Sequence, residues 1–528
     1  MRRISILLGV VLTTFACAAN PRPQLPSAGS PAASRSIIHV LNRTSFGVRP
    51  GGRERVQAMG LAAYIDEQLH PERIADNALE LMLSPLTGLR DTPRTFAADY
   101  YLPMMTARQE FMRTQNPPKG VMPALRGHLL PIAAMTLPGG DRPVTILQQS
   151  PVTSEELRYQ RENQLVFDDL RGQKLLRAVY SERQLQEVLT DFWFNHFNVD
   201  AQKLEDKPVV AEYERDVIRP RVFGRFRDLL EATAKSPAML FYLDNWLNSA
   251  PKGLNENYGR ELMELHTLGV DGGYTQADVV NVARAFTGWT LSKPHEATGF
   301  EFNDKKHDHS AKRVLGHTLK AGRGIEDGED VLDILARHPS TARFIATKLV
   351  RRFVADDPPP ALVDGAAKTF RRTDGDLREV MRVILTAPEF YAATTYRAKT
   401  KTPFELVTSA LRATGAVVTN PRTFVGSIAG MGEPLYQCQP PTGYGDRQQI
   451  WVNTGTLLSR MNFAYALAAN GLNAARIDLT ASGAPGRVAA DIFGDDVSPE
   501  TRTAIDAAGR PTPVRLSLLL GSPEFQRR

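Results

Sequence analysis

The sequence has few cysteines, no long apolar run and no cluster of basic residues, and each absence excludes a class of protein. Only Cys17 and Cys438 occur in 528 residues, so disulfides cannot hold a chain of this size together. No apolar stretch reaches the roughly 18 residues that span a bilayer, so we expect no transmembrane segment in the mature chain. Lys and Arg number 64 against 58 Asp and Glu without a basic run, so we expect no nucleic-acid binding.

Several catalytic signatures are missing as well. The sequence has no His-Glu-x-x-His zinc motif, no Cys-x-x-Cys-His haem motif, no Gly-x-Ser-x-Gly elbow and no phosphate-binding loop. No motif marks Cys438 as a nucleophile, so we expect it to be a small buried residue. With 42% hydrophobic residues the chain has the composition of a globular protein, held together by a large apolar core.

The N-terminus has the composition of a secretory signal peptide. Arg2 and Arg3 precede a short apolar run, and Ala-Cys-Ala at 16–18 fits a small-x-small cleavage site. We therefore expect a signal peptide over 1–18, a Pro/Ala/Ser-rich linker over 19–36 and an exported protein, periplasmic or extracellular. Lipid attachment at Cys17 is the second choice, because the residues before it fit a lipoprotein signal poorly. Cleavage removes two arginines and lowers the net charge from +6 to +4.

From residue 37 onward the pattern is mainly helical. Capping signatures, in which a side chain accepts a backbone N–H of the first helical turn, predict helix starts near Ser181, Thr275, Asp376 and Thr402. We expect one large multi-helix domain over 37–528, with a loop-rich insertion at 113–155 where Pro and Gly replace the periodic pattern. Strand-like alternation is scarce, and at most one small hairpin is expected, formed by 300–302 and 313–315.

The segment 255–269 has the highest density of polar side chains on a helical pattern. At 100° per residue, Glu261 falls inside the apolar arc, while Asn257 and Glu264 flank one margin and Arg260 lies on the polar face. A carboxylate on a buried stripe needs a partner or a proton, and such a group is typical of a general base or a metal ligand. A structural ion pair with an arginine of another helix explains the pattern equally well.

A second candidate segment is Asp-Phe-Trp-Phe-Asn-His-Phe at 191–197. His196 follows Phe192 by four residues, so it continues the apolar stripe of its helix and is expected to point inward. A neutral imidazole in the core is the simpler interpretation, and the alternative places His196 beside Glu261 as an acid or a co-ligand. Asp191 and Asn195 lie one turn apart, where they could orient the imidazole or a ligand.

A third segment, His307-Asp308-His309, suggests a metal. On a strand, His307 and His309 would face the same way and could share a divalent cation, with Asp308 between them. The spacing fixes no third ligand, and neighbouring lysines and arginines disfavour a cation. A solvated basic loop is therefore the more frequent outcome for such a segment.

Taken together, these segments resemble the large bacterial family called domain of unknown function 1800. The resemblance covers about 37–470 and rests on the motifs at 39–47, 192–197, 236–245, 255–269, 273–289, 307–316 and 342–349. The chain departs from the family pattern at Phe194, where a histidine is frequent, and at 442–446, where an Asn-Val-Lys-Gly-Trp run is usual. The resemblance implies an exported helical protein and no defined reaction. It also implies a sulfatase-like partner of the alkaline phosphatase superfamily.

Two functional hypotheses follow from the sequence. The first is a cell-envelope enzyme, most simply a hydrolase, with Glu261 as base, His196 as acid or orienting group, and Arg260 or Lys312 binding an anion. The second is a non-catalytic binding or assembly protein that pairs with the sulfatase-like neighbour. A haem- or metal-dependent redox role is a weaker third interpretation.

Overall fold

The computed structural model describes residues 31–114, 129–135, 144–149, 152–203, 207–292, 299–478, 484–494, 496–509 and 512–528. The expected signal peptide at 1–18, most of the expected linker and most of the 113–155 insertion lie outside these residues. The described chain is mainly α-helical with a few short two-stranded sheets, as the sequence predicts. Helix α1 (Pro31–Thr44) begins inside the range expected to be linker, so the helical body starts earlier than predicted.

The remaining helices follow α1 in chain order. In the first half of the chain they are α2 (Gly52–Met59), α3 (Leu61–Leu69), α4 (Asn77–Leu83), α5 (Pro93–Phe96), α6 (Leu102–Thr114), α7 (Ser154–Tyr180), α8 (Gln184–His196), α9 (Pro208–Glu212), α10 (Phe226–Ala234), α11 (Pro237–Tyr242) and α12 (Asn257–Glu261). In the second half they are α13 (Gln276–Ala285), α14 (Glu326–Arg337), α15 (Pro339–Phe353), α16 (Pro360–Arg372), α17 (Leu377–Thr386), α18 (Pro403–Thr414), α19 (Pro421–Gly430), α20 (Gln448–Trp451), α21 (Thr454–Ala468), α22 (Ala484–Phe493), α23 (Pro499–Ala507) and α24 (Thr512–Gly521).

In the described part of the chain, three π-helical turns interrupt the regular helices: η3 (Ala97–Tyr101), η4 (Tyr213–Ile218) and η7 (Leu262–Thr267). A π-turn inserts one residue into the helical repeat, and such turns are frequent at functional sites. The turn η7 follows α12 directly and lies in the segment that the sequence predicts to be a regular helix. It therefore shifts every side chain after Glu261 relative to the expected helical face.

The strands form antiparallel pairs. These pairs are β1 (Leu129–Met135) with β2 (Val144–Gln149), β3 (Trp289–Leu291) with β4 (Phe300–Phe302), β5 (Lys312–Val314) with β6 (His317–Leu319), and β7 (Val417–Val418) with β8 (Ala475–Arg476). The expectation of one hairpin between 300–302 and 313–315 is wrong, because each segment pairs with a different strand. The reason is the turn at Leu315-Gly316, where both residues have positive φ and close β5 onto β6.

Capping chemistry fixes most of the expected helix starts. The hydroxyls of Thr275 and Thr402 accept backbone N–H groups in reciprocal capping boxes, and Asp376 caps α17 in the same position. These three predictions are confirmed. At the fourth, α8 begins at Gln184 rather than directly after Ser181. The Ser181 hydroxyl donates to Asp76 and accepts from the backbone N–H of Arg183 at 3.0 Å, so it does not cap the helix in the expected position.

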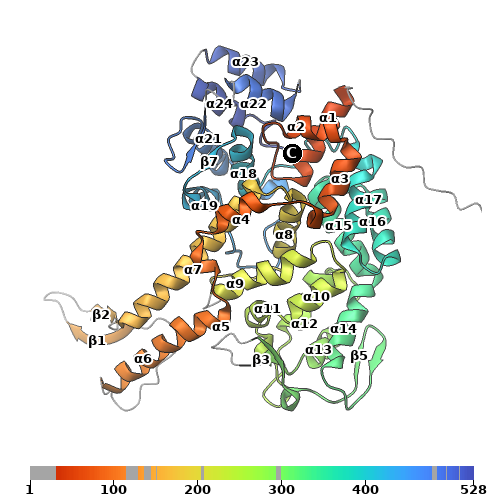
Figure 1. Cartoon of the computed structure of the whole chain (residues 1–528). Helices are drawn as coiled ribbons and strands as arrows, with labels where there is room; N and C mark the ends of the chain where they lie inside the picture. The colour runs from red at the N-terminus through yellow and green to blue at the C-terminus, as the bar shows by residue number, and fades with distance from the viewer. Residues whose placement is uncertain are drawn as a thin grey trace, which may run out of the picture.

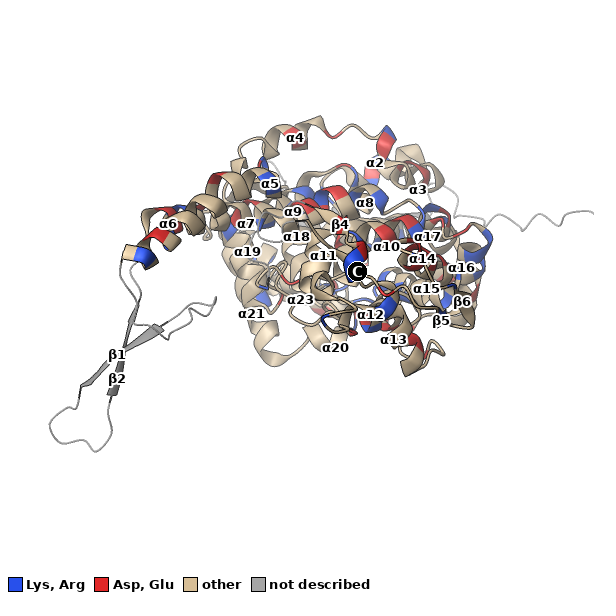
Figure 2. Ribbon diagram, turned by 90° about the horizontal axis from the view of Figure 1, so that it is seen from below, with Lys and Arg blue, Asp and Glu red and all other residues tan. Residues whose placement is uncertain are grey.

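One cluster of buried apolar side chains extends from Ile37 to Phe525 and includes most of the helices. Helix α8 lies near the middle of the body, with α15 to α17 on one side and α18 to α24 on the other (Figure 1). Helices α6 and α7 pack on each other. Helix α6 and the N-terminal part of α7 project away from the body, whereas the C-terminal part of α7 is buried in the core (Figure 1). Acidic and basic side chains are mixed along the helices (Figure 2). Among the described helices, none is both long and apolar enough to cross a membrane.

Candidate functional site

A polar cavity of about 50 Å³ lies between α7, α8, α15 and the segment 433–446. That volume holds roughly three water molecules. The charged or acidic side chains in its wall are Lys174 from α7, Asp191 from α8, Arg352 from α15, and Glu433 and Asp446 from the segment after α19. The cavity therefore gathers ionisable groups from both halves of the chain against an otherwise apolar core.

Asp191 is the ion-paired carboxylate of the cavity. Its oxygens lie 2.8 Å from Lys174 Nζ and 3.8 Å from Arg352 Nη2. Lys174 also lies 3.9 Å from Glu214, a fully buried residue of the π-turn η4. Burial alone would lower the pKa of Lys174, but the carboxylates of Asp191 and Glu214 outweigh it and raise that pKa. Lys174 is therefore a protonated cation that holds Asp191 in place.

Glu433 has the opposite electrostatic environment. Burial, followed by the negative charge of Asp191, raises its pKa to about 8, although the backbone N–H of Phe404 donates to its Oε2 at 2.7 Å. No lysine or arginine forms an ion pair with it among the described residues. At neutral pH Glu433 is therefore a protonated carboxylic acid, beside a carboxylate that is paired with two cations.

Tyr436 occupies a strained position in the same wall. Its φ is 63°, a region that bulky side chains rarely adopt, and its ring is 5% exposed. The hydroxyl donates to Glu214 Oε2 at 2.6 Å, and the backbone oxygen accepts from Ala201 N at 2.8 Å. Backbone strain of this kind persists where the surrounding contacts fix the residue, and it is frequent at functional sites.

Asn195 attaches the loop 443–446 to α8. Its side-chain amide donates to Tyr444 O at 2.8 Å and accepts from Tyr444 N at 2.7 Å. Gly443 has a φ of 70°, and a Cβ there would lie 2.2 Å from Asn195 O, so only glycine fits. Phe194 and the loop residues Tyr444, Gly445 and Asp446 also line the cavity.

His196 lies beside the cavity and is neutral. Its side chain is 1% exposed, as the apolar stripe predicts, and its Nε2 lies 3.1 Å from the carbonyl oxygen of His266. Lys348 Nζ donates to His196 Nδ1 at 2.9 Å, which requires the proton on Nε2. Burial and then the charge of Lys348 lower the pKa of His196 well below its usual value.

Lys348 is an unusual cation, because its hydrogen-bond partner is a neutral base rather than a carboxylate. Burial lowers the pKa of its ammonium to about 8, although the charge of Asp446 opposes the change. It lies one helical turn before Arg352 on α15, so it is near the cavity although it is not one of the lining residues.

The predicted residues of 257–264 lie apart from this cavity. Asn257 donates to Leu243 O at 3.2 Å, Arg260 pairs with Glu256 at 3.2 Å, and Tyr274 donates weakly to Glu264 at 3.5 Å. Glu261 is partly exposed, and burial followed by the charge of Glu264 raises its pKa. Among the described residues, Glu261 has no hydrogen bond or ion pair to His196, whose ring contacts His266 O and Lys348 Nζ.

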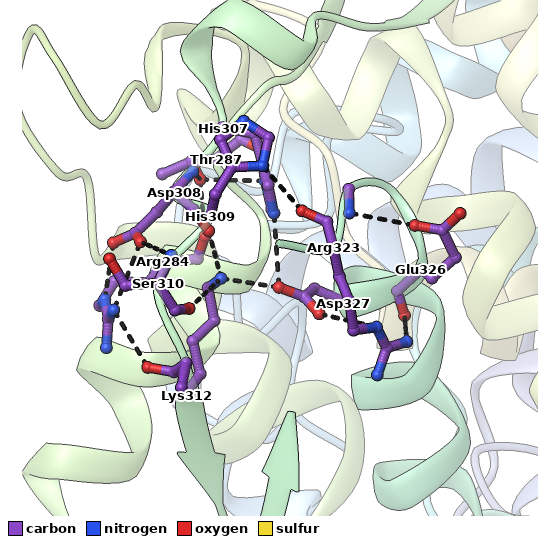
Figure 3. A network of polar contacts seen from close by, with 12 residues as sticks. Arg284, Thr287, His307, Asp308, His309, Ser310, Lys312, Arg323, Glu326 and Asp327 are labelled. Carbon is purple, nitrogen blue, oxygen red and sulfur yellow. Dashed lines mark hydrogen bonds and ion pairs between the residues drawn. The ribbon is translucent and has the colours of Figure 1, made fainter. Parts of the chain in front are cut away.

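The predicted metal segment takes part in a network of hydrogen bonds and ion pairs (Figure 3). Asp308 is held by Arg284 at 2.7 Å, and His307 places Nδ1 2.8 Å from Thr287 O and Nε2 3.4 Å from Asp327. His309 is exposed and bonded to backbone oxygens. In the part of the chain that the structure describes, no group of three such side chains is arranged to bind an ion.

The buried centre of that network is Asp327, which is 0% exposed. Lys312 donates to it at 2.6 Å, and Arg323 approaches it at 3.3 Å. Burial would raise the pKa of the neighbouring Asp308, but hydrogen bonds from Arg284 and Ser310 lower it overall. Asp327 Oδ2 accepts from Lys312, whereas Asp327 Oδ1 is buried without a hydrogen bond and has only the ion pair with Arg323. These contacts tie β5 and α14 to the loop at 304–311.

Comparison of the sequence with known protein families gives a match. The family model described as "Protein of unknown function (DUF1800)" matches residues 39–527. The chain belongs to this family. No curated protein matches the DUF1800 chain, and no solved structure matches it either.

The cavity of this DUF1800 protein combines residues that the sequence predicts with others that it does not. Asp191 and Asn195 line it and His196 lies beside it, as members of one predicted segment. Lys174, Arg352 and Glu433 were missed, because each stands singly in a different helix or loop. The one available signal was Lys174, a cation within the apolar pattern of its helix, next to Leu175 and Leu176.

Proposed function

We propose that this DUF1800 protein is an exported cell-envelope hydrolase whose reaction takes place at the cavity of Asp191 and Glu433. The observation that carries the proposal is the contrast between two carboxyl groups of one cavity. Asp191 is paired with Lys174 and Arg352, whereas Glu433 has a pKa of about 8 and no ion-pair partner among the described residues. Pairs of carboxyl groups whose environments separate their protonation states supply the base and the acid of hydrolytic reactions.

The roles follow from these protonation states. Asp191 accepts a proton from a water molecule, whose oxygen attacks the electrophilic carbon of the substrate. Glu433 donates its proton to the leaving oxygen as the scissile bond breaks. Proton exchange with solvent then restores both groups. Because the cavity has room for only a few waters, it admits the scissile group and the attacking water rather than a whole substrate.

The neighbouring residues position the acid and the base. Lys174 and Arg352 fix the Asp191 carboxylate, and Asn195 holds the loop that carries Tyr444 against α8. Arg352 is itself anchored by Glu405, so removal of Arg352 disturbs a buried network as well as the site. Lys348 supplies a positive charge beside the cavity, where it stabilises negative charge that develops on the substrate.

The test is a comparison of isosteric variants on a panel of chromogenic esters and glycosides. Asp191→Asn and Glu433→Gln should each lower kcat/KM by at least about 100-fold, since general acid–base catalysis contributes that much. Glu264→Gln, on the surface of η7, is the matched control and should retain full activity. Turnover that survives both cavity substitutions would contradict the proposal, as would a protein that hydrolyses no member of the panel.

A further inference from the structure

Helix α21 presents an apolar face to solvent. The side chains along this face and the preceding turn are between 42% and 61% exposed, although all are large and hydrophobic: Ile450, Val452, Leu457, Leu458, Met461 and Tyr465. Within α21 the spacing of these residues places them on one side of the helix. The opposite side is buried against the core through Phe463, Ala464 and Leu467. We call the six exposed residues the α21 face.

The α21 face carries no exposed charge. Between Val452 and Asn470 the single charged residue is Arg460, which is 2% exposed. Its guanidinium donates inward to Lys401 O and Gln526 Oε1 at 2.9 Å. Surface helices normally alternate apolar and charged sides, whereas the centres of protein interfaces are depleted of charge and enriched in aromatic residues and methionine. The face therefore has the composition of an interface centre.

The size of the face fits a macromolecular partner. The six side chains expose an apolar area on the order of 600 Å², at the upper end of the largest patches on monomeric proteins. A standard interface buries about 800 Å² on each partner. The face is adjoined by uncharged residues that are also exposed: Asn453, Thr454 and Asn462. These residues supply part of the additional area that a standard interface needs.

We propose that the α21 face binds the α21 face of a second copy of this chain around a two-fold axis. A two-fold axis sets each surface against itself, so any exposed charge near the axis would face its own sign. Because the α21 face has no exposed charge, two copies of it can meet at the axis without repulsion between like charges. A membrane surface is a poorer occupant, since helices that lie on lipid carry Lys and Arg along the rim of their apolar side and α21 exposes neither.

Disulfide trapping tests the arrangement directly. In a Cys17→Ser background the remaining cysteine, Cys438, is buried, so a cysteine introduced on the surface reports its own neighbours. Leu457→Cys, Leu458→Cys and Met461→Cys are oxidised separately, and at least one should give a covalent dimer. Val270→Cys is the control, because Val270 is 68% exposed and lies outside the face. It should stay monomeric on a non-reducing gel.

Sedimentation of the full chain completes the test. The unmodified protein should sediment as a dimer at micromolar concentration, and Leu458→Asp with Met461→Asp should give a monomer with an unchanged circular dichroism spectrum. The proposal is overturned by a monomer at all concentrations, by a dimer that survives the double substitution, or by cross-linking at Val270 as strong as on the face. The proposal is equally overturned if the protein is a monomer whose α21 face binds neutral lipid vesicles or a different protein, such as a sulfatase-like partner.

Discussion

At the scale of single residues, the buried Lys174 couples two carboxylates that come from different parts of the chain. It lies 2.8 Å from Asp191 and 3.9 Å from Glu214, with its side chain 11% exposed. Its removal leaves two poorly solvated negative charges close together, which is costly because their desolvation is no longer offset. Lys174 therefore affects both stability and the proposed function, because its charge stabilises the fold and also positions Asp191, the proposed base.

Lys174→Met should therefore lower the free energy of unfolding by about 3–5 kcal/mol, as expected when one partner of a buried pair is lost. Lys203→Met is the matched control, since the Lys203–Asp244 pair is 39% exposed on both sides and should contribute less than about 1 kcal/mol. Urea unfolding followed by circular dichroism measures both. Equal losses in the two variants would show that Lys174 is not a buried ion-pair partner.

Glu433 makes stability depend on pH. Folding raises its pKa from 4.5 to about 8, so between these values the folded state binds more protons than the unfolded state. Its contribution to stability is complete below about pH 4.5 and is lost as the pH rises through about 8. The free energy of unfolding of the wild type, relative to Glu433→Gln, should fall by about 1 kcal/mol per pH unit across this window. If the free energies of unfolding of the two proteins changed in parallel with pH, the raised pKa of Glu433 would be contradicted.

Lys348 should react with amine-directed reagents at lower pH than ordinary lysines. Burial lowers its pKa to about 8, whereas surface lysines ionise near their usual 10.5. Competitive acetylation followed by peptide mass spectrometry should give half-maximal labelling of Lys348 near pH 8. Lys252, which is exposed, provides the internal reference. A labelling curve of Lys348 that coincides with that of Lys252 would refute the assignment.

At the scale of elements, the sequence predicts local structure where local chemistry decides it. Thr275 and Thr402 cap α13 and α18, and each exchanges hydrogen bonds with the residue three positions later in the chain. Both helices begin where the capping pattern indicates. The phase of 257–267 was mispredicted for the opposite reason. The π-turn η7 packs against α14 and α15, which come later in the chain, and no local pattern marks it.

The loop at 443–446 provides a test at this scale. Gly443→Ala places a methyl group 2.2 Å from Asn195 O and forces alanine to a φ of 70°, so the loop must leave α8. We expect a loss of about 2–3 kcal/mol in the free energy of unfolding. Gly432→Ala is the control, because Gly432 has a φ of 99° but nothing within 4 Å of its Cβ position. It should lose about 1 kcal/mol, and an equal loss in both would exclude the Asn195 contact as the cause.

At the scale of the whole molecule, the helical class and the continuous body follow from composition and periodicity, whereas the site does not. The cavity forms only when α7, α8, α15 and the segment after α19 pack together, and its members are far apart in sequence. Asp191 and Asn195 were predicted because they share a dense motif with His196. Glu433 stands in an ordinary loop sequence, and only burial beside Asp191 gives it an unusual pKa.

The central claim is that one cavity holds a paired carboxylate and a protonated carboxylic acid. Infrared difference spectroscopy of the wild type against Glu433→Gln measures this directly, since a protonated carboxyl has its own C=O stretching band. The account predicts that this band is present at pH 7, is absent from Glu433→Gln, and disappears as the pH rises past about 8. A wild-type spectrum at pH 7 without the band would show that Glu433 is ionised and would contradict the proposed acid.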